Sequence, residues 1–107
     1  MQLRIVLIAD HIEIQAVGDT SRHTDKLKEA GFAFSKDIRK GYFASQAEIG
    51  WRKSKRLTKE MITDPAKSVI TEELRELKSL GLPAPKIVIS QLELLTSQAI
   101  LGLPDGN

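Results

Sequence analysis

The first 17 residues limit the possible folds most strongly, because they hold the clearest β-strand patterns in the chain. Residues 2–9 are rich in Leu, Ile and Val, which is typical of a buried strand. Residues 12–17 alternate apolar and polar side chains with a period of two, as in a strand with one buried face. Asp10 and His11 separate the two segments. The pattern therefore predicts either a β-hairpin or one long, bulged strand.

Turn and cap residues predict a helix after these strands. Residues 18–21 (Gly-Asp-Thr-Ser) are typical of a turn followed by a helix N-cap. The helix is expected to run to about Ala30 and to bury Leu27 and Ala30, with Gly31 just after its end.

Aromatic residues predict two further strands. Phe32 and Phe34 alternate with smaller residues, which favours a short strand, and Tyr42-Phe43-Ala44 forms a second one after the charged turn at residues 36–41. Residues 1–44 are therefore predicted to form a ββαββ unit.

Residues 46–63 are predicted to form an amphipathic helix. Ser45 and Glu48 have the spacing of a capping box. On a helical wheel the basic side chains occupy one arc, and the opposite arc holds Ala47, Trp51, Ser54, Leu57, Thr58, Met61 and Ile62. Gly50 costs a helix about 1 kcal/mol relative to alanine. A strand or irregular segment through residues 49–51 is the alternative.

Two more helices are expected in the last third of the chain. The first opens at Asp64-Pro65 or at Thr71, carries a buried stripe of Ile70, Leu74 and Leu77, and stops before Gly81. Residues 86–89 follow as a short strand or an extended link. Ser90 can cap a last helix whose inward side chains are Leu92, Leu95, Ala99 and Ile100.

These elements predict one α+β domain over residues 1–107. It has a small antiparallel sheet in residues 1–44, two or three helices packed on it in residues 45–101, and a frayed tail at residues 102–107. A chain of 107 residues, 41% hydrophobic and 28% charged, is long enough for one core. Cysteine is absent, which fits a reducing cytoplasm. The N-terminal apolar run is too short for a membrane span, so no membrane partner is expected.

Positive charge is concentrated between Lys36 and Lys59. This segment holds eight of the sixteen basic residues and only two of the fourteen acidic ones. Cations interleaved with aromatic side chains are typical of surfaces that neutralise phosphates and stack bases. A solvated surface that keeps the protein soluble is the alternative. The predicted binding residues are Lys36, Arg39, Lys40, Tyr42, Arg52, Lys53, Lys55, Arg56 and Lys59.

No motif indicates catalysis, a metal or a cofactor. His11 and His23 are the only histidines, and they lack the spacing that would aim two ligands at one ion, so both are predicted to be turn or surface residues. The chain has neither the nucleophile-elbow pattern of serine hydrolases nor the glycine patterns of nucleotide-binding loops. We therefore expect a protein that is not an enzyme.

Residues 12–44 resemble a short unit found in many phage- and plasmid-encoded proteins of unknown function. The unit has the form G-x-T, L-K-x-x-G, aromatic, lysine, aromatic, and here it is carried by Gly18, Thr20, Leu27, Lys28, Gly31, Phe34, Lys40, Tyr42 and Phe43. The aromatic positions are usually tryptophan, the hairpin here is one residue longer, and Thr24 replaces a lysine. The resemblance covers about a third of the chain and implies a mobile-element origin among DNA-processing proteins.

Two functions compete on these observations. The first is a protein that binds nucleic acid through the basic surface, with little sequence specificity because no side chain can be assigned to reading bases. The second is a phage- or plasmid-encoded inhibitor or adaptor that docks on an acidic host protein or nucleoprotein complex through the same surface. The C-terminal helices are also a candidate homodimer contact.

Overall fold

The computed structural model describes residues 1–56 and 69–102 and has an α+β fold. A five-stranded sheet has the order β3-β4-β2-β1-β5. Its strands are β1 (Gln2–Ile8), β2 (His11–Val17), β3 (Ala33–Ile38), β4 (Glu48–Arg56) and β5 (Lys86–Ile87). The helices are α1 (Thr24–Glu29), α3 (Val69–Ser79) and α4 (Gln91–Ile100). The predicted fold class and the ββαββ order are confirmed.

β1 and β2 form the hairpin that the N-terminal pattern predicted. They pair antiparallel over their whole length, from Gln2 opposite Val17 to Ile8 opposite His11. The chain reverses at Ala9 and Asp10, and the pairing of the two strands has no break.

 The turn places Ala9 at a φ of 54°, in the left-handed region that tight hairpin turns require. The alternative of one long, bulged strand is therefore wrong.

β4 replaces most of the helix predicted over residues 46–63. It pairs antiparallel with β2 and β3, and Gly50 lies opposite Val17. A methyl group on Gly50 would overlap the carbonyl oxygen of Ala16, so the close approach of the two strands requires glycine. The strand alternative through residues 49–51 is thus correct. Residues 57–63 of the predicted helix lie outside the described residues.

The period of two in β4 is not visible in the sequence as an alternation of apolar and polar residues, because lysines occupy positions that face the core. Along residues 51–56 half-buried and exposed side chains alternate strictly. The half-buried ones are Trp51, Lys53 and Lys55.

Residues 42–44 were predicted to be the fourth strand, which is wrong: Tyr42 and Phe43 lie in a turn of the β3–β4 loop (residues 39–47).

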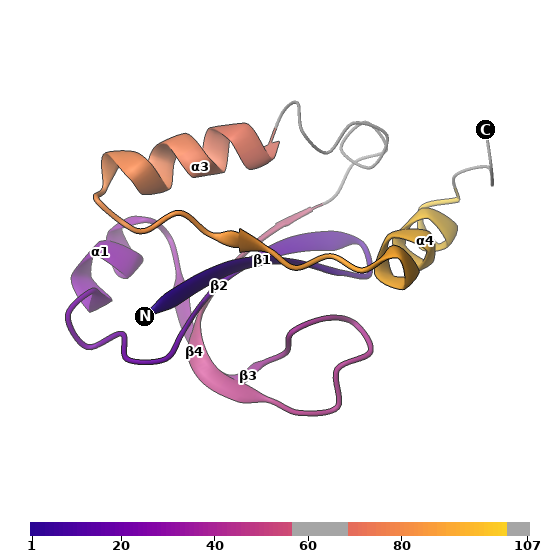
Figure 1. Ribbon diagram of the computed structural model, residues 1–107, viewed down its shortest axis with the longest axis horizontal. Helices are drawn as coiled ribbons and strands as arrows, with labels where there is room; N and C mark the ends of the chain where they lie inside the picture. Colours follow the sequence, from indigo (N-terminus) through magenta and orange to yellow (C-terminus); the bar gives the residue numbers. More distant parts are fainter. Residues whose placement is uncertain (57–68, 103–107) are drawn as a thin grey trace.

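One face of the sheet, the helix-covered face, carries the core. Its buried side chains come from alternate positions of the hairpin and from α1, α3 and the segments beside them: Leu3, Ile5, Leu7, Ile12, Ile14, Ala16, Leu27, Ala30, Phe32, Leu77 and Leu82. Leu27 of α1 and Ala30, which caps its C-terminus, are buried as predicted; the helix begins at Thr24, after a turn in which the Ser21 amide donates to Asp19 Oδ1. α3 and the β3–β4 loop lie on opposite sides of the strands (Figure 1).

The C-terminal part differs from its prediction in two respects. β5 is a two-residue strand that pairs parallel with β1, so the sheet is mixed. Ser90 caps α4 with a full capping box to Glu93, as predicted. The expected inward stripe is wrong: Leu92, Leu95 and Ile100 are exposed, whereas Leu94, Ser97 and Leu101 turn inward. Both stripes satisfy the helical period, and packing against β1 selects the second.

Two further predictions fall partly outside the described residues. α3 begins at Val69, so the start at Asp64-Pro65 lies in the part that is not described, as do residues 103–107 of the predicted tail. Leu77 of α3 is buried and Leu74 half-buried, as expected. Among residues 1–56 and 69–102, no helix has the length and apolar character needed to cross a membrane.

Candidate functional site

The second face of the sheet, which we call the polar face, carries buried polar side chains where a core would be expected. Arg4 of β1 lies opposite Gln15 of β2, and Gln15 lies opposite Arg52 of β4. Glu13 lies opposite Ser54 in the same way. Arg4, Glu13 and Gln15 are all buried. Buried polar groups are costly unless they are hydrogen-bonded, so their partners define the site.

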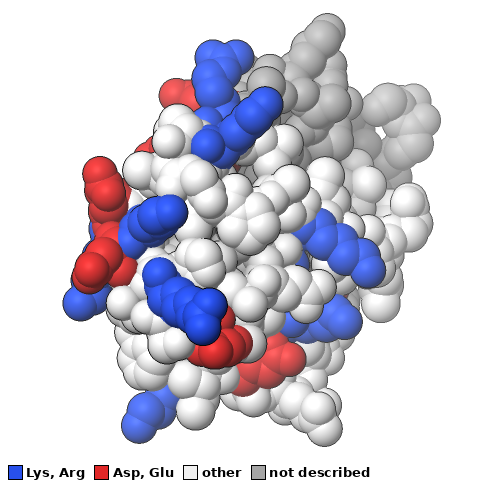
Figure 2. Space-filling view, turned by 60° about the vertical axis from the view of Figure 1, so that its left-hand side comes forward, with Lys and Arg blue, Asp and Glu red and all other residues white. Residues whose placement is uncertain are grey.

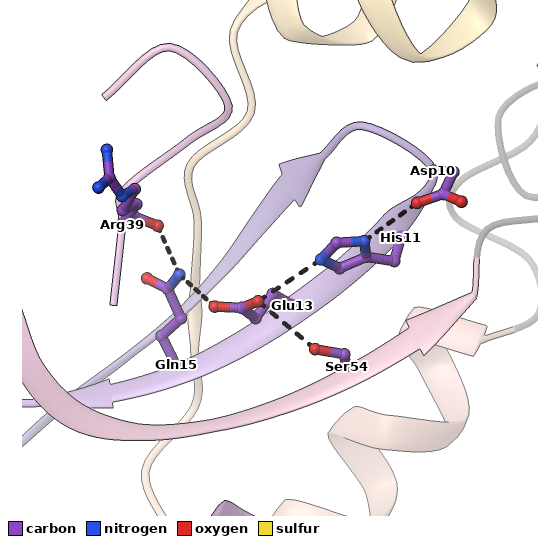
Figure 3. Close-up of polar contacts among 6 residues, drawn as sticks. All are labelled: Asp10, His11, Glu13, Gln15, Arg39 and Ser54. Carbon is purple, nitrogen blue, oxygen red and sulfur yellow. Dashed lines mark hydrogen bonds and ion pairs between the residues drawn. The ribbon is translucent and has the colours of Figure 1, made fainter. Parts of the chain in front are cut away.

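Gln15 stands at the centre of the hydrogen-bond network. The guanidinium Nε of Arg4 donates to Gln15 Oε1 at 2.6 Å. The Gln15 amide nitrogen donates to Glu13 Oε1 at 2.9 Å and to the backbone carbonyl of Arg39 at 2.6 Å. Arg4 also donates to Glu48 at the start of β4, at 2.6 Å. This network fixes the orientation of the Gln15 amide and anchors the β3–β4 loop to the sheet (Figure 3).

The Glu13 carboxylate receives further polar contacts from the opposite side. Ser54 Oγ donates to Glu13 Oε2 at 3.4 Å, and His11 Nε2 lies 3.6 Å from the same oxygen. The other ring nitrogen of His11 is 3.2 Å from Asp10 Oδ1, so the imidazole lies between two carboxylates (Figure 3). The hydrogen bond with His11 holds the pKa of Asp10 below its ordinary value.

An open pocket of about 180 Å³ lies over this network, and we call it the Glu13 pocket. Residues of β1, β2, β3, the β3–β4 loop and β4 line it: Ile8, His11, Glu13, Asp37, Arg39, Gly41, Tyr42 and Arg52. Arg39 is held in place by Asp37 at 2.9 Å and by the carbonyl of Ala44 at 3.2 Å. The loop is in turn packed on α4, because a methyl group on Gly41 would overlap the Glu93 carboxylate.

Three of the nine predicted binding residues meet at the Glu13 pocket. Arg39 and Tyr42 come from the β3–β4 loop, and Arg52 comes from β4. Arg56 lies on the same face, opposite His11. Lys40 lines a neighbouring depression of the loop with Ser45 and Gln46, and Lys36 is exposed on β3.

Lys53 and Lys55 point to the other face of the sheet, contrary to the prediction of one basic helix face. Both lie beside the buried carboxylate of Glu73 on α3: Lys53 Nζ is 3.3 Å from it, and Lys55 Nζ forms an ion pair with it. The hydrogen bond to Glu73 raises the pKa of Lys55. The reason is geometric, because neighbouring residues of a strand point to opposite faces. Lys59 lies outside the described residues.

Figure 2 shows how charged side chains are distributed over one face of the molecule. Lys and Arg side chains in Figure 2 are scattered singly or in small groups, and acidic side chains lie beside several of them. The described residues on the face shown in Figure 2 therefore form no single continuous basic patch.

The sequence interpretation missed the residues at the base of the pocket. His11 was expected to be a turn or surface residue, but it starts β2 and lines the pocket. Glu13 and Gln15 were counted only as the polar half of an alternating strand. No sequence signal marked them, because the groups that pair with Gln15 on this face, Arg4 and the Arg39 carbonyl, come from distant parts of the chain.

Comparison of the chain with protein-family models, with curated proteins and with solved structures found no match. Within residues 1–56 and 69–102, no group of three His, Cys, Asp or Glu side chains is arranged to hold a metal ion.

Proposed function

We propose that this chain is a non-enzymatic protein of the cytoplasm that binds single-stranded nucleic acid on its polar face. The observation that carries the proposal is the Glu13 pocket, where Arg39, Tyr42 and Arg52 come together from separate segments. Two cations beside an exposed aromatic ring are the combination that grips a backbone and stacks a base. The resemblance of residues 12–44 to a phage and plasmid unit supports a mobile-element origin.

A single strand fits this face better than a duplex. Tyr42 is 47% exposed and its ring meets that of Phe43 edge to face, with the centroids 5.0 Å apart. Stacking on such a ring requires a base that has left its own stack. Arg52 and Arg56 lie two positions on either side of Ser54 on the same strand face, about 13 Å apart along the strand, so they can contact two separate phosphates of an extended strand.

Titration of a fluorescently labelled oligonucleotide, followed by anisotropy at increasing salt, tests the proposal. Binding should weaken with a log-log slope of about −0.7 for each phosphate contacted. Arg52→Gln with Arg56→Gln should weaken binding and flatten this slope. Arg75→Gln is the matched control, because Arg75 is an exposed arginine on α3. Binding that is insensitive to salt, or equally weakened by Arg75→Gln, would refute the proposal.

A protein partner is the second candidate, and exposed apolar side chains favour it. Phe43 on the β3–β4 loop is 56% exposed and Leu92 on α4 is 60% exposed. Aromatic and arginine side chains are enriched at the centres of protein interfaces. A stoichiometric host protein that survives nuclease treatment, and that is lost with Phe43→Ser or Leu92→Ser, would favour an inhibitor or adaptor. Light scattering of the purified chain would reveal a homodimer formed through α4.

A further inference from the structure

The Glu13 carboxylate forms the base of the Glu13 pocket, and the hydrogen bond from the Gln15 amide fixes its orientation. Glu13 is only 2% exposed and still lines the pocket. Arg4 occupies the oxygen of the Gln15 amide, so the amide nitrogen must face Glu13 and the Arg39 carbonyl. A carboxylate has about four acceptor sites; Gln15 and Ser54 take one each, and His11 Nε2 lies 3.6 Å from the oxygen that Ser54 contacts. The Glu13 carboxylate therefore retains acceptor capacity for a group that enters the pocket.

The charges around the pocket restrict what that group can be. Glu13 and Asp37 would repel a phosphate at the base of the pocket. Arg39 and Arg52 would repel a lysine or arginine side chain from a partner protein. A neutral planar ring with hydrogen-bond donors meets neither penalty, and the Tyr42 ring at the rim can stack on it.

We infer that the Glu13 pocket takes one unstacked nucleobase that carries an exocyclic amino group, and that it discriminates against thymine and uracil. This inference rests on the proposed function. An amino group on cytosine or adenine donates a hydrogen bond to Glu13, as carboxylates do with cytosine N4 in nucleic-acid complexes. Thymine and uracil present only an imide N–H between two carbonyl oxygens, and those oxygens face the carboxylate unfavourably.

Binding of oligo(dC), oligo(dA) and oligo(dT) of equal length to the wild-type chain at one salt concentration tests the inference. We expect oligo(dC) and oligo(dA) to bind about tenfold more tightly than oligo(dT). An oligo(dC) whose N4 amino groups are dimethylated should bind like oligo(dT), because it has lost the donor hydrogens. This probe leaves the protein unchanged, so folding defects cannot produce the result.

Glu13→Gln then tests the residue itself. The variant should lose the preference for oligo(dC) and keep its affinity for oligo(dT), which also reports that it is folded. Equal binding of all oligonucleotides by the wild type, with the salt dependence retained, would overturn the inference and leave the proposed function standing. Undetectable binding of every oligonucleotide would overturn both. A preference that persists with dimethylated oligo(dC) would also overturn the inference.

Discussion

On β4, Lys53 and Lys55 point to the face covered by α3, whereas Arg52 and Arg56 point to the polar face. The two lysines lie against Ile14 and Ile12 in the register of the sheet and close on the buried carboxylate of Glu73. The two arginines stay exposed: Arg52 lines the Glu13 pocket with residues of the β3–β4 loop, and Arg56 lies opposite His11. Four neighbouring cations thus fall into two pairs with different environments.

This difference shows that the number of cations in a segment does not predict how many of them lie on a surface that can bind a ligand. The lysines that meet Glu73 are neutralised within the fold, and they stabilise the packing of α3 on the sheet. Within residues 1–56 and 69–102 neither Arg52 nor Arg56 forms an ion pair, although Arg56 lies near Asp10, so we infer that both can contact a ligand. The predictions below test this division, beginning with the largest expected effect.

Replacing both lysines should destabilise the fold most. Lys53→Met with Lys55→Met leaves the Glu73 carboxylate buried without a cation, which we expect to lower the free energy of unfolding by about 3 kcal/mol. Arg52→Met with Arg56→Met is the matched control on the other face, and it should change stability by less than about 0.5 kcal/mol. Urea denaturation followed by circular dichroism measures both. Equal losses of stability in the two double variants would contradict the difference between the two faces.

Gly50→Ala tests whether residues 48–56 form a strand. Only a strand places the lysines and the arginines on opposite faces of the sheet. The added methyl group overlaps the Ala16 carbonyl, so the free energy of unfolding should fall by about 2 kcal/mol. In an exposed helix the same change would raise stability by about 1 kcal/mol. The sign of the change in the urea midpoint separates the two structures.

Ser90→Ala tests how much the capping box at the start of α4 contributes to stability. The Ser90 hydroxyl accepts from the Glu93 amide, and removing this cap should cost about 1 kcal/mol. Ser90→Asp, which keeps the cap, should retain the stability of the wild type. Thermal unfolding of the two variants gives the comparison, and an equal loss in both would contradict the capping role.

Alkaline pH should lower the free energy of unfolding slightly, through the loss of the ion pair between Lys55 and Glu73. Glu73 raises the pKa of Lys55 above its ordinary value of 10.5, so the protonated lysine stabilises the folded state. This contribution is fully present below pH 10.5 and is lost as the pH rises through the higher pKa of the folded state. Lys55 is 34% exposed, so we expect a loss below about 1 kcal/mol. Lys55→Met should abolish this part of the pH dependence in denaturation curves.

The sequence predicted the local elements with strong signals. The β1–β2 hairpin, the burial of Leu27 and Ala30 on α1, and the Ser90 cap of α4 all follow from short-range periodicity and cap chemistry. β4 could not be predicted with the same certainty, because lysines at its core-facing positions conceal the period of two. Of the candidate site, Arg39, Tyr42 and Arg52 were predicted as binding residues, whereas Glu13 and Gln15 were not predicted at all.

By itself the sequence determined the α+β class, the β1–β2 hairpin and the concentration of cations between Lys36 and Lys59, because these depend on residues close together in the chain. The tertiary structure decided which face each cation occupies and which acid it meets. Glu73 lies 18 residues beyond Lys55 in the chain, and only the packing of α3 on β4 brings the two together. Likewise, only the pairing of β1, β2 and β4 aligns Arg4, Gln15 and Arg52 across the polar face.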